Sequence, residues 1–260
     1  MIRSQVEAVP TEYGTYQSRW TLVLLQHCLE VLAGYSLSGI WRLLRRLGIH
    51  YKRGQQHVHS PDPEYRGKAA RIAECVQAAR DRPGAVVTLF LDEFTFYRWT
   101  GMAPVYASAG RIQPRVTLPC RYNTAGRIVS VIDAVSAKVL YLQRSHITAA
   151  VLAELMLTIR TAYPNAQVIY LVQDNWHNVH FHPKQVAAAQ EARITLIGMP
   201  TYSAWLNPIE KLWRKLKQEV LLMHQTGEDW DGLKKRVTDF LNSYSSGSPD
   251  LLKYVGLLPN

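Results

Sequence analysis

The sequence has no apolar run long enough to cross a membrane, and it has only three cysteines. A membrane-spanning helix needs about 20 consecutive apolar residues, whereas the longest runs here, such as VVTLFL and VIYLV, have the length of strands. The N-terminal stretch lacks the apolar core of a secretory signal. Cys28, Cys75 and Cys120 lie far apart and lack metal-ligand spacing. We therefore predict a soluble cytoplasmic protein with reduced cysteines.

Acidic residues are few compared with basic ones. The chain of 260 residues has 20 Asp and Glu against 30 Lys and Arg, a formal net charge of +10. This balance favours a polyanionic partner, nucleic acid before an anionic membrane surface. A Gly-rich phosphate loop and a Gly-x-Ser-x-Gly elbow are also absent from the sequence, which disfavours nucleotide hydrolases and serine esterases.

Residues 1–54 have a helical and basic pattern. A mostly apolar helix is predicted over 20–33, and a second helix begins after Ser36 or Ser38 and ends before Gly48. One face of the second helix is apolar at Ile40, Leu43, Leu44 and Leu47. The other faces of this helix and the short extension after it carry basic residues and no acidic residue: Arg42, Arg45, Arg46, Lys52 and Arg53. The pattern predicts a partial helix-turn-helix segment with a wing that binds DNA, although a plain amphipathic helix with a solvated cationic face has the same spacing.

After residue 54 the pattern changes from helical to alternating. Residues 55–84 read as a Gly-, Ser- and Pro-rich linker and a connecting helix over 66–80. Strands are predicted over 85–94, 126–143 (two, with a turn near 136–137), 167–173 and 194–199, and helices over 148–162, 183–193 and 207–220. We predict an α/β domain over 85–225, a mixed sheet flanked by helices, followed by a C-terminal helical tail over 226–260.

Two carboxylates follow strongly apolar segments. Asp92 comes after VVTLFL and Asp174 after VIYLVQ, so each is expected where a buried strand stops, the edge at which open α/β sheets bind ligands. If the two strands are neighbours, the carboxylates converge and need a hard cation such as Mg²⁺ or Mn²⁺. The alternative is that each Asp only begins a turn, but Glu93 and Asn175 make both ends unusually polar.

A third carboxylate, Glu210, lies at the start of the helix predicted over 207–220. Asn207 suits the N-cap and Pro208 the first helical position, so Glu210 could serve only a capping box. The same place would also hold it rigidly against the edge of a sheet, where it could bind a metal. The residue pattern alone leaves both interpretations open.

The segments LFLDEFTF, LVQDNWHNVHFHP and PTYSAWLNPIEKLWRKLK together resemble the mariner superfamily of DDE transposases, in its bacterial insertion-sequence branch numbered 630. The string PxYSxxLNPIExxW is very specific to it. In the N-terminal part, YSLSGIWRLLRRLGIHYKRG followed by HSPDPEY resembles that family's second helix-turn-helix and linker. The resemblance covers roughly residues 35–220.

The resemblance implies an RNase H-like fold and a DNA transposase that cuts transposon ends and joins them to target DNA. It implies Asp92, Asp174 and Glu210 as catalytic residues that bind two Mg²⁺ or Mn²⁺ ions. Insertion at TA dinucleotides is implied as well. The implied partners are transposon-end and target DNA, in a homodimer on DNA within the bacterial nucleoid, and no membrane. Asn175, His180 and Asn207 are expected as auxiliary active-site residues. Further candidate phosphate contacts, for which a solvated surface is an equal alternative, are Arg111, Arg115, Lys211, Arg214 and Lys215.

Two features depart from the family's pattern. Thirty-five residues separate Asp174 from Glu210 (210 − 174 − 1), one more than expected, and the additional residue falls in NWHNVHFHP. Little sequence precedes Trp20, so the chain is expected to lack a first recognition module.

Several weaker candidates stay open beside this assignment. His177, His180 and His182 could bind zinc, but no fourth ligand is near them in the sequence. Asp133 is expected in a hairpin turn, and Glu93 is expected to alternate away from Asp92. For the whole chain, the rival functions are a nuclease that cuts without joining and a catalytically silent DNA-binding remnant.

Overall fold

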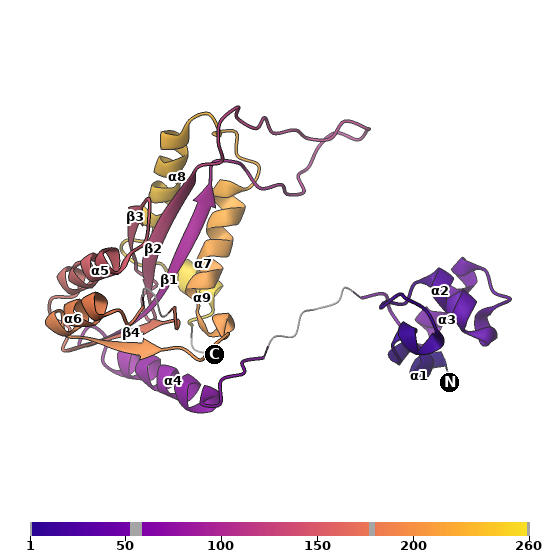
Figure 1. Ribbon diagram of the computed structural model, residues 1–260, viewed down its shortest axis with the longest axis horizontal. Coiled ribbons are helices and arrows are strands. Elements are labelled where there is room, and N and C mark those ends of the chain that lie inside the picture. Colours follow the sequence, from indigo (N-terminus) through magenta and orange to yellow (C-terminus); the bar gives the residue numbers. More distant parts are fainter. Residues whose placement is uncertain (1, 53–58, 177–179, 259–260) are drawn as a thin grey trace. The chain divides into compact units, whose positions relative to one another are not determined.

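The computed structural model describes residues 2–52, 59–176 and 180–258 (Figure 1). The chain divides into two compact units, Met1–Val58 and His59–Asn260. Among the described residues, none of the helices is both long and apolar enough to span a membrane.

The N-terminal unit is a small helical bundle. It contains α1 (Ile2–Glu7), α2 (Leu22–Cys28), α3 (Leu37–Arg46) and two short 3₁₀ turns, Pro10–Tyr13 and Glu30–Leu32. Its core consists of Leu25, Leu29, Leu32, Ile40 and Leu44. The first predicted helix is therefore shorter than expected, because the backbone is extended at Leu29.

Helix α3 confirms the second predicted helix in detail. The Ser36 hydroxyl accepts a hydrogen bond from the Gly39 amide at the N-cap. At the other end Gly48 has a φ of +71°, and the Ile49 amide donates to the Leu44 carbonyl, which is the geometry of a glycine C-terminal cap. Residues 2–52 contain no strand, so the expected wing is not present in that described range. Arg53 lies outside the described residues.

The second unit is built on a five-stranded mixed sheet in the order β3-β2-β1-β4-β5. Its strands are β1 (Val86–Tyr97), β2 (Ala125–Asp133), β3 (Val139–Arg144), β4 (Val168–Gln173) and β5 (Ile194–Gly198). The first three pair antiparallel, whereas β4 and β5 run parallel to β1. This confirms the predicted mixed α/β sheet, which is of the RNase H-like type.

Helices cover both faces of the sheet. One face packs on α5 (Ala149–Ala162) and α6 (Pro183–Glu191) through residues such as Leu89 and Leu171. The other face packs on α4 (Tyr65–Asp81), α7 (Ile209–Leu216), α8 (Trp230–Asn242) and α9 (Pro249–Val255) through residues such as Phe90 and Val172. Successive strand residues point to opposite faces of a sheet. A strand that is covered on both faces is therefore apolar at every position, which is the pattern that predicts these strands.

The C-terminal residues belong to this core. Leu233 and Val237 of α8 and Leu251 of α9 are fully or almost fully buried against the sheet and α7. The segment expected as a tail over 226–260 therefore completes one face of the second unit.

Strand β1 continues to Tyr97, beyond the predicted end at residue 94, and Asp92 lies within the strand and not at its end. The parallel pairing of β1 with β4 stops at Phe90 and Val172, while antiparallel pairing with β2 continues to Tyr97. Asp92 thus lies just beyond the end of its parallel neighbour, beside the open end of β4. An irregular segment over 98–124 then leads to β2 and projects from the unit (Figure 1).

Candidate active site

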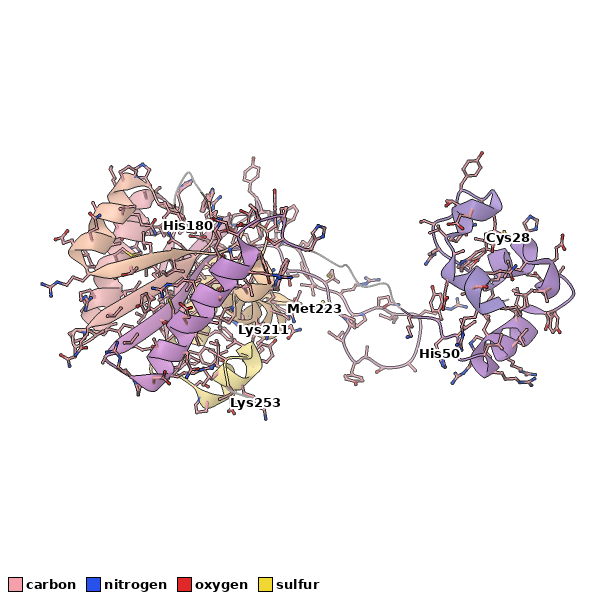
Figure 2. All side chains as sticks on the ribbon, turned by 90° about the horizontal axis from the view of Figure 1, so that it is seen from below. Cys28, His50, His180, Lys211, Met223 and Lys253 are labelled. Atoms are coloured by element: carbon pink, nitrogen blue, oxygen red, sulfur yellow. The ribbon has the colours of Figure 1, made fainter. Side chains whose placement is uncertain are left out.

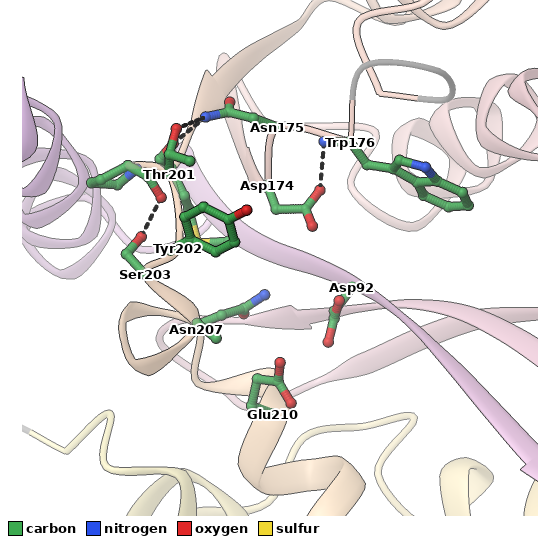
Figure 3. Close-up of a pocket in the computed structure, with 12 residues that line it drawn as sticks. Asp92, Asp174, Asn175, Trp176, Thr201, Tyr202, Ser203, Asn207 and Glu210 are labelled. Atoms are coloured by element: carbon green, nitrogen blue, oxygen red, sulfur yellow. Dashed lines mark hydrogen bonds between the residues drawn. The ribbon is translucent and has the colours of Figure 1, made fainter. Parts of the chain in front are cut away.

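Asp92, Asp174 and Glu210 line one open pocket of about 490 Å³ at the end of β4 (Figure 3). They come from three different elements: the middle of β1, the residue after β4, and the first turn of α7. The pocket also contains Asn175 and Asn207. The structure therefore brings together all three carboxylates that the sequence singled out.

Asp92 is the most enclosed of the three carboxylates. Trp213 of α7 donates a hydrogen bond from its Nε1 to the Asp92 Oδ2 at 2.9 Å, and its ring stacks on Phe94 with centroids 5.0 Å apart. Burial, together with the negative charges of Glu210 and Glu93, raises the pKa of Asp92 to about 7. Burial and the nearby carboxylates thus both disfavour the charged form of this side chain.

Asp174 is half exposed and held by two donors. Its Oδ1 accepts from the Trp176 amide at 3.1 Å and lies 2.5 Å from the His180 Nδ1. Burial by itself would raise the pKa of Asp174, but the hydrogen bond and charge of His180 lower it below the usual value. Burial opposes the charge on His180, yet Asp174 and Glu93 raise its pKa to about 10. His180, which is labelled in Figure 2, is fully buried.

Glu210 is exposed on the first turn of α7. Burial raises its pKa, an effect that Lys217 and Arg214 oppose and the charge of Asp174 supports. The Asn207 amide donates to the Ala204 carbonyl at 3.0 Å, so the contact that a capping box requires of Glu210 is already made by the backbone. The helix begins at Ile209 with Pro208 as its N-cap, one residue later than predicted.

The two asparagines support the walls of the pocket. The Asn207 Nδ2 donates to the Leu91 carbonyl at 3.0 Å, which ties the start of α7 to β1 beside Asp92. The Asn175 Nδ2 donates to the Met199 carbonyl at 2.9 Å and so connects the end of β4 with the end of β5. Both were expected in the site, and both lie in it as supports whose amide groups bond to the backbone.

The residues present suit a hard divalent cation in chemical type. Three carboxylates offer only oxygen ligands, which Mg²⁺ and Mn²⁺ prefer, and burial together with the neighbouring carboxylates raises the pKa of Asp92. Within the described ranges, no three His, Cys, Asp or Glu side chains are close enough to hold an ion as they stand. Asp174 and Glu210 are exposed, so their side chains are free to rotate within the pocket.

The zinc alternative has no support among the described residues. His180 contacts two carboxylates, and the His182 Nδ1 accepts a hydrogen bond from the Lys184 amide at the start of α6. His177 lies outside the described residues. Asp133 confirms the turn prediction, because its Oδ1 accepts from the amides of Val135 and Ser136.

The predicted DNA contacts divide into free and engaged cations. Arg42, Arg45, Arg46 and Lys52 of the N-terminal unit, and Arg111, Arg115 and Arg214 of the second unit, are exposed. The Lys211 Nζ instead donates to the Val255 carbonyl at 2.9 Å, beside the helix that carries Lys253 (Figure 2). Lys215 contacts Glu219 and the Tyr254 ring. The structure thus gives both lysines a role in attaching α9 to α7, which spacing on one helix cannot reveal.

Two neighbours of the carboxylates, the predicted core residue Trp213 and the candidate supporting residue Glu93, make contacts that the sequence did not indicate. Trp213 was predicted as core, and it is buried, but its indole N–H also reaches Asp92. Glu93 does point away from Asp92, as predicted, yet it contacts His180. The only signal in the sequence was their proximity to Asp92 and Glu210. Neither contact follows from a spacing, because each joins elements that are distant in the chain.

Comparison with known proteins gives two family matches. The model of the DDE superfamily endonucleases matches residues 87–231, and a model described as winged helix-turn helix matches residues 17–67. A 39 kDa uncharacterized protein of insertion element IS630 from Shigella sonnei is 24% identical over 248 residues. That alignment covers 94% of this chain and 70% of the relative.

The fold is also similar to solved structures. A pre-cleavage Mos1 transpososome superposes with a TM-score of 0.67 and 13% identity, over 98% of this chain and 73% of that one. The Mos1 strand transfer complex gives a TM-score of 0.64 and 14% identity, over 97% and 75%. At these identities the likeness concerns the fold alone.

Proposed function

The chain belongs to the DDE superfamily endonucleases, whose model matches more than half of it, and we propose that within this family it is a DNA transposase. It hydrolyses phosphodiester bonds at the ends of a mobile element and joins those ends to target DNA. The observation that carries the proposal is that Asp92, Asp174 and Glu210 line one pocket. The relative from IS630, which is named for an insertion element, supports the same activity.

The residues of the chain prepare the site. Trp213 fixes one oxygen of Asp92 by its indole N–H, and the Trp176 amide fixes one oxygen of Asp174. Asn207 fastens the helix that carries Glu210 to the strand that carries Asp92. The pocket of about 490 Å³ that the three carboxylates line is the proposed place of the phosphodiester.

Two Mg²⁺ or Mn²⁺ ions are the proposed cofactors, and they are held by Asp92, Asp174 and Glu210. When bound, such ions activate the attacking water or 3′-hydroxyl and stabilise the leaving oxygen. Two of the similar Mos1 structures are described as complexes with Mn and with Mg. Ion binding also compensates the negative charge that raises the pKa of Asp92.

The N-terminal unit is the proposed end-recognition module. Arg42, Arg45 and Arg46 lie exposed on α3, away from the apolar face formed by Ile40 and Leu44. A cationic helix that leaves one side free is suited to the phosphate backbone and the major groove. Because transposition joins two ends, we propose a homodimer on DNA. Several of the similar structures are described as paired-end complexes.

The test is cleavage of a duplex that carries the terminal repeat of the element, with Mg²⁺ or Mn²⁺, by the wild-type chain and by Asp174→Ala. A matched control is Glu191→Ala, which removes an exposed carboxylate from the last turn of α6 outside the pocket. We expect metal-dependent nicking at the end in the wild type and the control, and none in Asp174→Ala. Strand transfer is then measured with a pre-cut end and a target duplex.

Each other outcome contradicts a defined part of the proposal. Binding of the duplex without any cutting identifies a catalytically silent DNA-binding remnant. Cutting without transfer of a pre-cut end identifies a nuclease. Equal cutting by Asp174→Ala and wild type removes this pocket from the reaction altogether.

A further inference from the structure

A buried histidine, His180, contacts both Asp174 and Glu93. Glu93 points to the face of β1 opposite to that of Asp92. His180 is fully buried. Its Nδ1 lies 2.5 Å from the Asp174 Oδ1, and its Nε2 lies 2.7 Å from the Glu93 Oε1. Since each ring nitrogen faces a carboxylate oxygen, both nitrogens donate hydrogen bonds. The result is a continuous chain, Glu93–His180–Asp174, that ends at the pocket.

The two donors to Asp174 converge on one of its oxygens. Oδ1 receives the Trp176 amide at 3.1 Å as well as His180. The His180 Nδ1 also lies 3.1 Å from the Asp174 carbonyl, so the ring is fixed against the backbone and the side chain of the same residue. Figure 3 shows the other carboxylate oxygen of Asp174 directed toward Asp92. One oxygen is thus engaged, and the other is free for the pocket.

His180 is itself held by a strained and hydrogen-bonded backbone. The next residue, Phe181, has a φ of +59°. This backbone conformation is unfavourable for residues other than glycine and is found where surrounding contacts enforce it. The Phe181 amide donates to the Gln185 Oε1 at 2.7 Å. Gln185 in turn donates to the Oε1 of Gln173 at 2.7 Å, and both glutamines are fully buried. Gln173 ends β4, directly before Asp174.

These hydrogen bonds fix the position of His180 relative to β4, the strand that Asp174 follows. The Gln173–Gln185 pair connects β4 to α6, and the turn between them carries His180. Strain that is maintained by buried contacts beside a pocket points to a role in that pocket.

We propose that Glu93 and His180 are positioning residues that hold Asp174 with its free oxygen directed into the pocket, so that it binds a divalent ion. The inference rests on the proposed function only in assigning Asp174 as an ion ligand. Glu93 orients the ring of His180, and His180 orients the carboxylate. Groups that orient metal ligands in this way change metal affinity by about 10- to 100-fold when they are removed.

The test measures the binding of Mn²⁺ to the full chain without DNA, by the loss of the free Mn²⁺ signal in electron paramagnetic resonance. We expect His180→Ala to weaken Mn²⁺ binding by about 10- to 100-fold, and Glu93→Ala to weaken it in the same direction. Glu93→Gln keeps an oxygen that accepts from the His180 Nε2, so its affinity is expected near the wild-type value. His182→Ala is the matched control, because this histidine contacts the Lys184 amide at the start of α6.

Thermal unfolding in EDTA separates positioning from folding. If His180→Ala and His182→Ala both lower the unfolding temperature but leave Mn²⁺ affinity unchanged, His180 is structural and the inference is wrong. Equal loss of affinity in Glu93→Gln and Glu93→Ala also contradicts it, since hydrogen bonding by Glu93 would then not matter.

Asp174→Ala distinguishes failure of the inference from failure of the proposed function. If this variant binds Mn²⁺ as well as the wild type, the assignment of the metal site fails. If Asp174→Ala loses binding while His180→Ala retains it, only the positioning role is rejected.

Discussion

The indole Nε1 of Trp213 donates a 2.9 Å hydrogen bond to the Oδ2 of Asp92. Trp213 is buried on the apolar side of α7 and stacks on Phe94, so a residue of the core also orients a residue of the pocket. The helix that brings Glu210 to the site is therefore connected to Asp92 through its own packing. Loss of this hydrogen bond should therefore lower the rate of the proposed cleavage, even though Trp213 does not line the pocket.

Trp213→Phe keeps a stacked ring but removes the donor. We expect end cleavage to fall by about 10-fold or more, because a hydrogen bond to a charged group contributes about 1.5–3 kcal/mol. Single-turnover cleavage measures this effect. Trp230→Phe is the control, since Trp230 packs on Phe96 elsewhere in the same core. A similar loss in both variants would mean that packing, and not the hydrogen bond, is responsible.

The raised pKa of Asp92 makes the stability of the ion-free protein depend on pH. The folded state keeps this proton up to about pH 7, whereas the unfolded state releases it near 3.8. The free energy of unfolding therefore decreases as the pH rises through this window. Asp92→Asn carries no titrating group, so the difference in stability between it and the wild type should grow from pH 4 to pH 7.

Urea unfolding in EDTA across this range measures that difference, and comparison of the two proteins cancels the contributions of His180 and Asp174. A difference that stays constant with pH would show that Asp92 ionises normally. Saturating Mg²⁺ should reduce the difference at pH 7, because an ion that binds only the folded wild type stabilises it.

Lys211 and Arg214 lie on the same helix but are expected to act differently. Lys211 holds the end of α9 by a hydrogen bond to Val255, so Lys211→Met should lower the free energy of unfolding by about 1 kcal/mol and leave DNA binding unchanged. Arg214 is exposed, so Arg214→Met should weaken DNA binding and hardly change stability. Chemical unfolding and duplex binding at several salt concentrations measure both quantities, and the reverse result would exchange the two roles.

The basic face of α3 predicts a salt-dependent contribution to binding. Arg42 and Arg45 are exposed, and the Arg45 guanidinium lies 5.1 Å from the centroid of the exposed Trp41 ring. If Arg42 contacts a phosphate, Arg42→Ala should reduce the slope of log affinity against log salt by about 0.9. Fluorescence anisotropy with a terminal duplex measures the slope. Lys184→Ala removes an exposed cation of α6 as a control, and an unchanged slope in Arg42→Ala contradicts the assignment.

Much of the local structure follows from the sequence. The glycine end at Gly48 and the turn at Asp133 are predicted, and the N-cap is narrowed to Ser36 or Ser38, because each depends on contacts within a few residues. The strands were predicted because residues buried on both faces form continuous apolar runs. The three pocket carboxylates were singled out as polar residues at the ends of such elements, and the family resemblance joined them into one set.

Contacts between distant elements decided the rest. The sequence could not indicate that β1 continues past Phe94, since antiparallel pairing with β2 extends it to Tyr97. It left open whether Glu210 caps a helix or faces a pocket, and only the Asn207 hydrogen bond to Ala204 shows that the cap is already satisfied. By its place on one helix, Lys211 was a candidate either for DNA contact or for a solvated surface. In the structure it donates a hydrogen bond to Val255 of α9, 44 residues away in the sequence. Periodicity and capping depend on residues that are close in the sequence, so the sequence alone predicts them. The contact partner of a side chain depends on how distant elements of the unit pack together, so only the tertiary structure shows it.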